Sequence, residues 1–488
     1  MGKGGRNHAT RGRRRLPVVL VLVLVVVVGG AAAAWRLGYA DDLVDRFTTA
    51  GAPDPVTEPA DVAPPEGIDV PELPEPDPVA EAADEGRLVP SAVRRALARG
   101  LADRDLGRSV HVAVAALGGG DGPAYTVDTR GDTAIPASTM KVLTGTAALA
   151  SLGPDHRLAT TVVQQGRTLT LVGGGDPLLE RAPVDGDVPD AADVTTLARE
   201  TAAALRERKG KASPVRLAYD ASLFTGPDES PFWRADYVPD DIVSPIRALW
   251  VDEGLAPDRS FRVDDPSLAA ADAFAAALRR AGVRVQGAPT ERRAPRGATE
   301  LARVESPPLS QVVEHVLEVS DNEGAEVLAH HVGIAELDDA SFAGGAAGVR
   351  RSLTDLGVDL AGAVIRDGSG LARDNRLAMT SLLGALQAAG DPVHPELRAV
   401  LTGLPVGGFT GSLAFRFDTA PEAGVGRVRA KTGSLGGVRS LAGIALDQRG
   451  TPLVFVLAAD RIREVDTLDA QQDLDNVAAA LGACRCSR

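Results

Sequence analysis

The sequence predicts a mixed α/β (α+β) fold, in which an antiparallel sheet is flanked by helices and accompanied by an all-helical lobe and a smaller inserted domain. Three observations predict it. Strand-like segments lie far apart in the chain, at 109–115 and again at 440–445 and 453–457. Apolar residues at helical spacing fill much of the stretch between them. A block of short strand-like pieces, from about residue 160, interrupts those helices and is interpreted as the insertion.

Composition limits the possible classes of function. The 488 residues are 44% hydrophobic, which is enough for two or more domains with sizeable cores. The formal net charge is −14, and the sequence contains no basic domain. A non-specific nucleic-acid binder needs a basic face, so we expect no nucleic-acid partner.

The N-terminus has the features of a targeting segment. Residues 1–15 are basic, and 16–35 form an uncharged apolar run about as long as a bilayer-spanning helix. Arginines on one flank of such a run place that flank in the cytoplasm. The small residues at 29–34 could instead mark a cleavage site, so a removed signal peptide stays an alternative to a transmembrane anchor. In either case we expect the rest of the chain to be extracytoplasmic.

Residues 36–87 have the composition of a disordered stalk. Between Asp41 and Glu85 there are fourteen aspartates and glutamates, one basic residue and nine prolines. Such a segment repels itself and cannot bury a core, so we expect it to hold the body away from the membrane.

The body is expected to begin at residue 88. A helix at 91–101 precedes two strands, at 109–115 and 124–127. The glycine run between these strands lacks the lysine and the following helix of a phosphate-binding loop, so it predicts a hairpin turn.

The inserted domain is expected to occupy 160–263. Its predicted elements are three strands and one helix, at 161–163, 169–172, 215–219 and 191–209. An amphipathic helix at 266–281 is then predicted to resume the main domain. That domain would consist of 88–159 and 264–488.

Two helices, at 309–317 and 323–331, are predicted after the insertion. The second ends in His330-His331, which invites a metal interpretation. Adjacent residues point to different helix faces, and no nearby cysteine or histidine completes a ligand set, so we interpret both as structural or surface histidines and expect no metal or other cofactor. None of the seven histidines lies in a recognisable Ser-His-Asp motif.

The C-terminal part is predicted to complete the sheet. An edge strand at 426–433 is followed by the strands at 440–445 and 453–457 and by a covering helix at 467–481. The two cysteines, at 484 and 486, are too close together to staple a fold and are interpreted as a local or an intermolecular disulfide.

Ser138 and Lys141 are the first candidates for chemistry. The apolar repeat that follows them predicts a helix, which places the hydroxyl and the amine on one face, one turn apart. A serine needs a base to take its proton, and a lysine can be that base when burial or nearby cations lower its pKa. A simple alternative is a helix start followed by a solvated lysine.

Lysine usage favours the chemical interpretation. The chain has five lysines, at 3, 141, 209, 211 and 431, among 52 lysines and arginines. Where a bare cation suffices, this sequence uses arginine, which cannot act as a base at accessible pH. Two of the five lysines lie in the short motifs Ser138-x-x-Lys141 and Lys431-Thr432-Gly433.

Three motifs occur in order: Ser-x-x-Lys at 138, Ser-Asp-Asn at 320 and Lys-Thr-Gly at 431. The ordered trio resembles penicillin-binding proteins and serine β-lactamases. The first two motifs are 182 positions apart. In this wide interval the chain resembles the D-alanyl-D-alanine carboxypeptidase/endopeptidase family of low-molecular-mass (class C) penicillin-binding proteins, which carries an insertion there. The resemblance implies a penicillin-binding-protein/β-lactamase-like transpeptidase fold. The predicted insertion, 160–263, is short for that family's usual two lobes.

The resemblance also implies a role for each motif residue. Ser138 would attack the penultimate D-Ala carbonyl of a peptidoglycan stem peptide, and Lys141 would take its proton. Ser320 would pass a proton to the leaving amine, and Asn322 would bind the peptide amide. Backbone N–H groups of Ser138 and Ser434 would form the oxyanion hole. Lys431 and Thr432, with Gly433 completing the motif, would hold the substrate carboxylate and keep Lys141 deprotonated.

The expected activity is therefore a serine-type D-Ala-D-Ala carboxypeptidase, with DD-endopeptidase activity left open and β-lactams as covalent inhibitors. Two alternatives remain. A non-catalytic wall-binding scaffold would fit the anchored stalk, although it would have no need of Lys141. A β-lactamase is disfavoured because no glutamate-bearing loop for fast deacylation can be placed. The body would be held outside the cytoplasmic membrane by the N-terminal segment.

Overall fold

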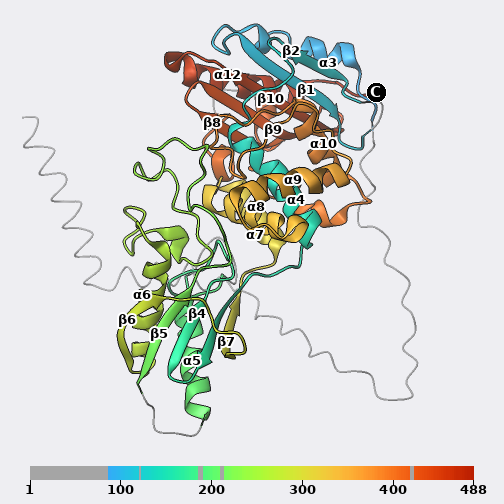
Figure 1. The fold of residues 1–488 in the computed structure, drawn as a ribbon. Helices are drawn as coiled ribbons and strands as arrows, with labels where there is room; N and C mark the ends of the chain where they lie inside the picture. The colour runs from blue at the N-terminus through green and yellow to red at the C-terminus, as the bar shows by residue number, and fades with distance from the viewer. Residues whose placement is uncertain (1–85, 120–121, 185–190, 209–213, 418–421) are drawn as a thin grey trace, which may run out of the picture. The chain divides into compact units, whose positions relative to one another are not determined.

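The computed structural model describes residues 86–119, 122–184, 191–208, 214–417 and 422–488 (Figure 1). The predicted basic segment, the anchor or signal peptide, and all but the last two residues of the predicted stalk lie outside the described residues. Among the helices that are described, none is both long and apolar enough to cross a bilayer.

The helices are α3 (Pro90–Leu97), α4 (Met140–Leu152), α5 (Val194–Glu207), α6 (Pro266–Arg280), α7 (Leu309–Glu318), α8 (Asn322–Leu337), α9 (Phe342–Asp355), α10 (Met379–Gly390), α11 (Ala399–Thr402) and α12 (Thr467–Ala483). The strands are β1 (Ser109–Ala116), β2 (Tyr125–Asp128), β3 (Ala159–Gln165), β4 (Thr168–Val172), β5 (Val215–Asp220), β6 (Val285–Glu291), β7 (Thr299–Glu305), β8 (Val428–Leu435), β9 (Val438–Leu446) and β10 (Pro452–Asp460).

The first sheet has the strand order β2-β1-β10-β9-β8, and every neighbouring pair is antiparallel. It joins the N-terminal hairpin to the three C-terminal strands, as the sequence predicts. Its two faces are both buried, which is why β10 reads as a continuous apolar run. Alternate residues of β10 point to opposite faces: Phe455 packs with α3 and α12, whereas Val454 and Val456 pack with α4 and α10.

The helical lobe is built around α4. This helix is apolar on all sides, and its residues from Met140 to Leu149 are buried. It packs against α7, α8, α9 and α10, and Figure 1 shows it within this group of helices. A helix that is hydrophobic all round belongs in the middle of a core, so the position of α4 follows from its composition.

The second sheet has the order β6-β5-β4-β3-β7, with β4, β5 and β6 parallel and β3 antiparallel to both of its neighbours. Its apolar cluster includes α5 and α6. The predicted boundary at 263 is therefore wrong: α6, β6 and β7 belong to the insertion, which ends with Glu305. The amphipathic face of α6 does bury, as its pattern indicates, but against the inserted sheet and not against the main domain.

A long connection within the insertion packs on the helical lobe. Between β5 and α6, a cluster formed by Val243, Ile246 and Trp250 contacts Val327 of α8 and Phe342 of α9. This connection, residues 221–265, brings polar groups of the insertion to the site described below.

The two ends of the described chain are joined. Leu88 and Ser487 form an antiparallel bridge, and Val89 N donates to the Cys486 carbonyl at 2.7 Å. Cys484 and Cys486 pair with each other, so the local disulfide is the alternative that the structure contains. Residues from 86 onward therefore belong to the packed body.

Candidate active site

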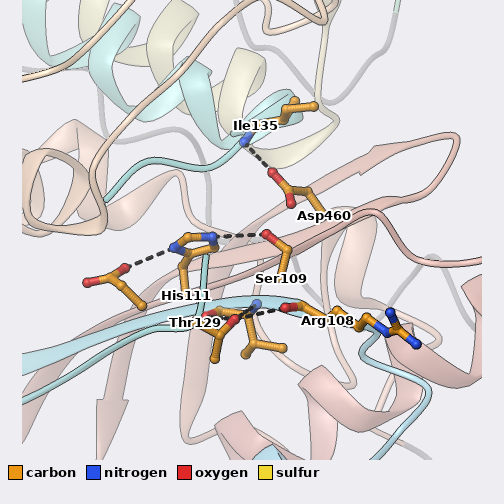
Figure 2. Close-up of polar contacts among 8 residues, drawn as sticks. Arg108, Ser109, His111, Thr129, Ile135 and Asp460 are labelled. Atoms are coloured by element: carbon orange, nitrogen blue, oxygen red, sulfur yellow. Dashed lines mark hydrogen bonds and ion pairs between the residues drawn. The ribbon is translucent and has the colours of Figure 1, made fainter. Parts of the chain in front are cut away.

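The segment before Ser138 is fixed by the first sheet. Asp460, the last residue of β10, accepts a hydrogen bond from Ile135 N at 3.3 Å (Figure 2). Ser440 of β9 donates its hydroxyl to the Pro136 carbonyl at 2.7 Å. Ala137 has φ 48°, a left-handed conformation that is costly for a residue with a side chain and that is tolerated where the surroundings hold it. The sheet thus determines where the chain enters the helix of Ser138.

Ser138 and Lys141 meet as the sequence predicts. Ser138 lies in a short 3-10 turn, Ala137–Thr139, that leads directly into α4. Lys141 Nζ is 3.0 Å from Ser138 Oγ. The amine also donates to Asn322 Oδ1 at 2.8 Å and to the Ser369 carbonyl at 2.9 Å. These contacts orient the amine toward the hydroxyl.

Burial changes the chemistry of Lys141. The side chain is inaccessible to solvent, and this desolvation lowers its pKa to about 8. The nearby carboxylates of Asp321 and Glu326 act in the opposite direction and moderate the effect. A substantial part of the Lys141 population is therefore neutral just above physiological pH, which a proton acceptor requires.

The Ser-Asp-Asn loop lies at the start of α8. Ser320 has φ 65°, another left-handed residue at the site. Asn322 donates through Nδ2 to the carbonyl of Ile242 in the connection 221–265, at 3.3 Å, while its Oδ1 accepts from Lys141. The hydrogen bond to Ile242 therefore helps to orient the side-chain amide of Asn322 so that its oxygen faces Lys141.

The turn that supplies the Ser369 carbonyl is held from two sides. Glu326 of α8, which is buried, accepts from Gly368 N at 3.0 Å and from Ser369 N at 2.8 Å. Burial, together with the charge of Asp367, raises the pKa of Glu326 to about 8. Asp367 in turn accepts from Trp233 Nε1 at 2.9 Å, so the connection 221–265 also supports this turn.

The Lys-Thr-Gly motif lies on β8, the edge strand that the sequence predicts. Lys431 is buried and donates to the Thr432 carbonyl at 3.1 Å, and the Thr432 hydroxyl donates to Ser412 Oγ at 2.9 Å. Burial is the main cause that lowers the pKa of Lys431, followed by repulsion from Lys141 and Arg416. Desolvation, more than the charge of Lys431, accounts for the lowered pKa of Lys141. The prediction that the charge of Lys431 keeps Lys141 deprotonated is therefore corrected: burial of Lys141 is the main cause.

Gly433 is required by close packing. A Cβ atom at this position would lie 2.7 Å from the Pro136 carbonyl oxygen and closer still to the Ser440 hydroxyl. Only glycine lets β8 approach the segment that carries Ser138.

A cleft brings the three motifs together. Of the predicted residues, Ser138, Ser320, Asn322, Thr432 and Ser434 line it, whereas Lys141, Lys431 and Gly433 are buried. The sequence analysis missed the remaining lining residues, which are Arg234, Tyr237, Ile242, Leu371, Arg373, Leu435 and Gly436. Arg373 lies two residues after the turn at 367–371, which contains two glycines. No periodicity could have indicated Arg234 or Tyr237, because they come from an irregular connection.

Three of the described histidines have structural positions. His330 and His331 are buried and hydrogen-bond to the carbonyls of Glu326 and Gly175, at 2.7 and 3.0 Å. His111 contacts Ser109 Oγ at 3.2 Å, as Figure 2 shows. Its other ring nitrogen lies 2.9 Å from an Asp128 oxygen. This row of groups resembles a relay, but Ser109 is 2% exposed and none of the three residues lines the cleft. It links β1 to β2.

Comparison with known families gives a match over most of the body. The sequence model of the D-Ala-D-Ala carboxypeptidase 3 (S13) family matches residues 93–259 and 256–481. Carboxypeptidase Rv3627c of Mycobacterium tuberculosis is 36% identical over 364 residues, which cover 72% of this chain and 76% of that protein. Carboxypeptidase DacB of Mycolicibacterium smegmatis is 36% identical over 361 residues, with the same two shares.

A solved structure agrees. Penicillin binding protein 4 (dacB) from Haemophilus influenzae is similar with a TM-score of 0.64 at 21% identity, over 79% of this chain and 98% of that one. This likeness confirms the predicted penicillin-binding-protein-like fold. Because the family model covers most of the chain and the relatives cover more than two thirds of it, the chain belongs to the D-Ala-D-Ala carboxypeptidase 3 (S13) family of serine peptidases.

Proposed function

We propose that this chain is a serine-type D-Ala-D-Ala carboxypeptidase that acts on peptidoglycan stem peptides through an acyl-enzyme on Ser138. The observation that carries the proposal is the buried amine of Lys141, 3.0 Å from Ser138 Oγ, with a pKa lowered to about 8. Family membership and the carboxypeptidases among the relatives support the reaction class.

Acylation begins when neutral Lys141 accepts the proton of Ser138. Oγ then forms a bond to the carbonyl carbon of the penultimate D-Ala, and the carbonyl oxygen becomes an oxyanion. The backbone N–H groups of Ser138 and Ser434, two residues that line the cleft, would stabilise it. One such donor is commonly worth about 3 to 4 kcal/mol of barrier.

Collapse of the oxyanion breaks the C–N bond and releases the terminal D-Ala. Its amine takes a proton through the hydroxyl of Ser320, which can be resupplied by Lys141. Water then attacks the ester carbonyl, Lys141 again takes a proton, and Ser138 leaves. The side-chain amide of Asn322 lies between Lys141 and the Ile242 carbonyl and can contact the peptide backbone.

The terminal carboxylate of the substrate needs a positive environment. Thr432 lines the cleft, and a bound carboxylate would favour the charged form of the neighbouring Lys431, against the burial that lowers its pKa. A β-lactam carries a carboxylate and a strained amide in the same relation, so it should acylate Ser138 as well. The Haemophilus influenzae protein of the same fold has been solved with a β-lactam.

The scaffold alternative is disfavoured by energetics. Burying a lysine amine is costly, and a wall-binding protein would gain nothing from placing it against a serine. The β-lactamase alternative is disfavoured by the relatives, which are carboxypeptidases.

We expect the full chain to release D-Ala from a peptide ending in D-Ala-D-Ala, measured by an assay for free D-Ala. Because only the neutral form of Lys141 accepts a proton, the acylation rate should rise with pH through about 8 and level off above it. A rate that is flat from pH 6 to 9, or absent throughout, would contradict the assignment of Lys141 as the base. A D-Ala-cross-linked peptide dimer tests endopeptidase activity, which yields two peptides and no free D-Ala, so its products are separated by chromatography.

We also propose that the N-terminal segment anchors the chain in the cytoplasmic membrane, with the body outside. Support comes from the uncharged run at 16–35 and the arginines that precede it. The acidic, proline-rich stalk would then separate the body from the bilayer.

Removing residues 1–85 should leave the chemistry intact. The body keeps its Leu88–Ser487 bridge and the Val89–Cys486 hydrogen bond, so the shortened chain should be soluble and should hydrolyse the peptide as fast as the detergent-solubilised parent. The comparison requires kcat/KM and thermal unfolding of both. A loss of folding would mean that the stalk packs on the body, against the linker interpretation. A second truncation that also removes Leu88 and Val89 is expected to lower Tm.

A further inference from the structure

Three side chains that the proposed reaction does not use converge beside the Ser-Asp-Asn loop. They are Glu253, in the connection 221–265, His315 of α7 and Asp321, the N-cap residue of α8. One oxygen or nitrogen from each lies within 4.8 Å of the others. Segments far apart in the sequence therefore place two carboxylates and one imidazole around a single point.

Asp321 distinguishes this site from a cluster of acidic side chains on the surface, because it is buried. The residue is 6% exposed, and by distance and angle neither of its carboxylate oxygens has a hydrogen-bond partner within the described part of the chain, although the Gly324 N–H and the charge of Lys141 act to lower its pKa. Although it occupies the N-cap position of α8, its side chain makes no cap hydrogen bond. An unpaired buried carboxylate is costly, so the arrangement favours a positively charged ligand at this point.

One neighbouring cation, Arg262, is already engaged by another carboxylate. Arg262 pairs with Glu323 at 2.6 Å, and the same Glu323 oxygen accepts from Ser244 N. His315 Nε2 lies 4.0 Å from Glu253 Oε1, which leaves space for an ion between these two atoms. Burial raises the pKa values of Asp321 and Glu253 to about 7, and each is raised further by a neighbouring carboxylate. A cation bound between these side chains would relieve the repulsion between the carboxylates.

We propose that Glu253, His315 and Asp321 bind one divalent transition-metal ion of the Zn²⁺ or Mn²⁺ class. Imidazole and carboxylate ligands suit these ions, and bonds of about 2.0 to 2.2 Å place ligand atoms roughly 3 to 4 Å apart, close to the observed grouping. The ion would touch no substrate. Because Asp321 stands between Ser320 and Asn322, it would fix the loop that carries both and tie it to α7 and to the insertion. This site does not depend on the proposed reaction.

The test is metal binding by the full chain, freed of metal by a chelator and dialysed against Zn²⁺ or Mn²⁺, with metal content measured by mass spectrometry. Two variants remove ligands, Glu253→Gln and His315→Gln. Matched controls are Asp473→Asn, from the other acidic grouping of the described residues, and His394→Gln, a histidine paired with Glu396. The acidic residues at 41–85 are present in all variants and contribute the same background.

We expect the parent to bind one more metal ion per chain than either ligand variant does. Both control variants should bind as many ions per chain as the parent. Affinity should fall by at least about 100-fold in each ligand variant, since even groups that only orient a ligand are worth about 10- to 100-fold. The ion should raise Tm in the parent and the controls and leave it unchanged in the ligand variants.

Co²⁺ provides a readout that is independent of affinity. Its visible absorption should report nitrogen ligation in the parent and should change on His315→Gln. If Zn²⁺ and Mn²⁺ bind no more tightly to the parent than to both ligand variants, the carboxylates share protons in place of a metal ion and the proposal is wrong. It is equally wrong if Asp473→Asn removes the additional ion. Asp321→Asn tests the same point if one of the other ligand variants does not fold.

Discussion

Replacing Ser138 with alanine will abolish covalent labelling by a penicillin and leave the fold intact. In the proposed reaction the hydroxyl oxygen forms the acyl bond, and it lies 3.0 Å from the lowered-pKa amine of Lys141. Alanine fits the start of a helix without added volume. Intact-protein mass spectrometry after exposure to a β-lactam should show a one-adduct shift in the parent and none in Ser138→Ala, and the two Tm values should agree closely.

Ser151→Ala is the matched control. Ser151 lies on the same helix, α4, and its hydroxyl donates to Ser352 at 3.0 Å, away from the cleft. This variant should be labelled like the parent. An adduct that survives on Ser138→Ala would show that another residue is acylated, and peptide mapping would identify it.

Local patterns were sufficient to predict the motif residues and most of the main-domain elements. The repeat after Ser138 is helical, and a helix necessarily brings residues three apart onto one face, so the contact with Lys141 followed from spacing alone. Likewise, the alternating and apolar runs near the C-terminus became β8, β9 and β10 with little change in their bounds.

The domain boundary could not be predicted in the same way. The pattern of α6 shows that one face is buried, but it does not say which core covers that face. Only the pairing of β6 with β5 and of β7 with β3 assigns the segment to the insertion. Strand pairs that are distant in the sequence leave no local signal, because the partner residues are set by tertiary packing.

The same reason explains the missed site residues. Arg234 and Tyr237 reach the cleft because Val243, Ile246 and Trp250 bury the connection 221–265 on the helical lobe. Apolar residues in an irregular segment predict that the segment is buried, but they do not predict which part of the protein covers it. The two backbone carbonyls that orient the site, from Ser369 and Ile242, have no sequence signal, since every residue carries one.

Lys141→Arg will reduce the acylation rate far more than Lys431→Arg. Arginine keeps a cation at position 141 but cannot accept the proton of Ser138, and removal of a general base usually costs on the order of 10² to 10⁴ in rate. At position 431 the residue supplies positive potential beside the substrate carboxylate, so arginine should retain part of the rate. Lys431 is buried, however, and the bulkier side chain will cost some stability.

The measurement is the acylation rate constant with one β-lactam from pH 6 to 10, for the parent, Lys141→Arg, Lys431→Arg and Lys211→Arg, the last as a control outside the three motifs. The parent rate should rise through about pH 8, and Lys141→Arg should lose this rise because no neutral amine forms. Lys431→Arg should keep the rise at a lower plateau, and Lys211→Arg should match the parent. Since Lys141 has no room for a larger group, Lys141→Gln, with Tm recorded, separates loss of the base from loss of the fold. If Lys141→Arg acylates as fast as the parent, or if Lys431→Arg is the more damaged of two folded variants, Lys141 is not the base and the roles must be exchanged.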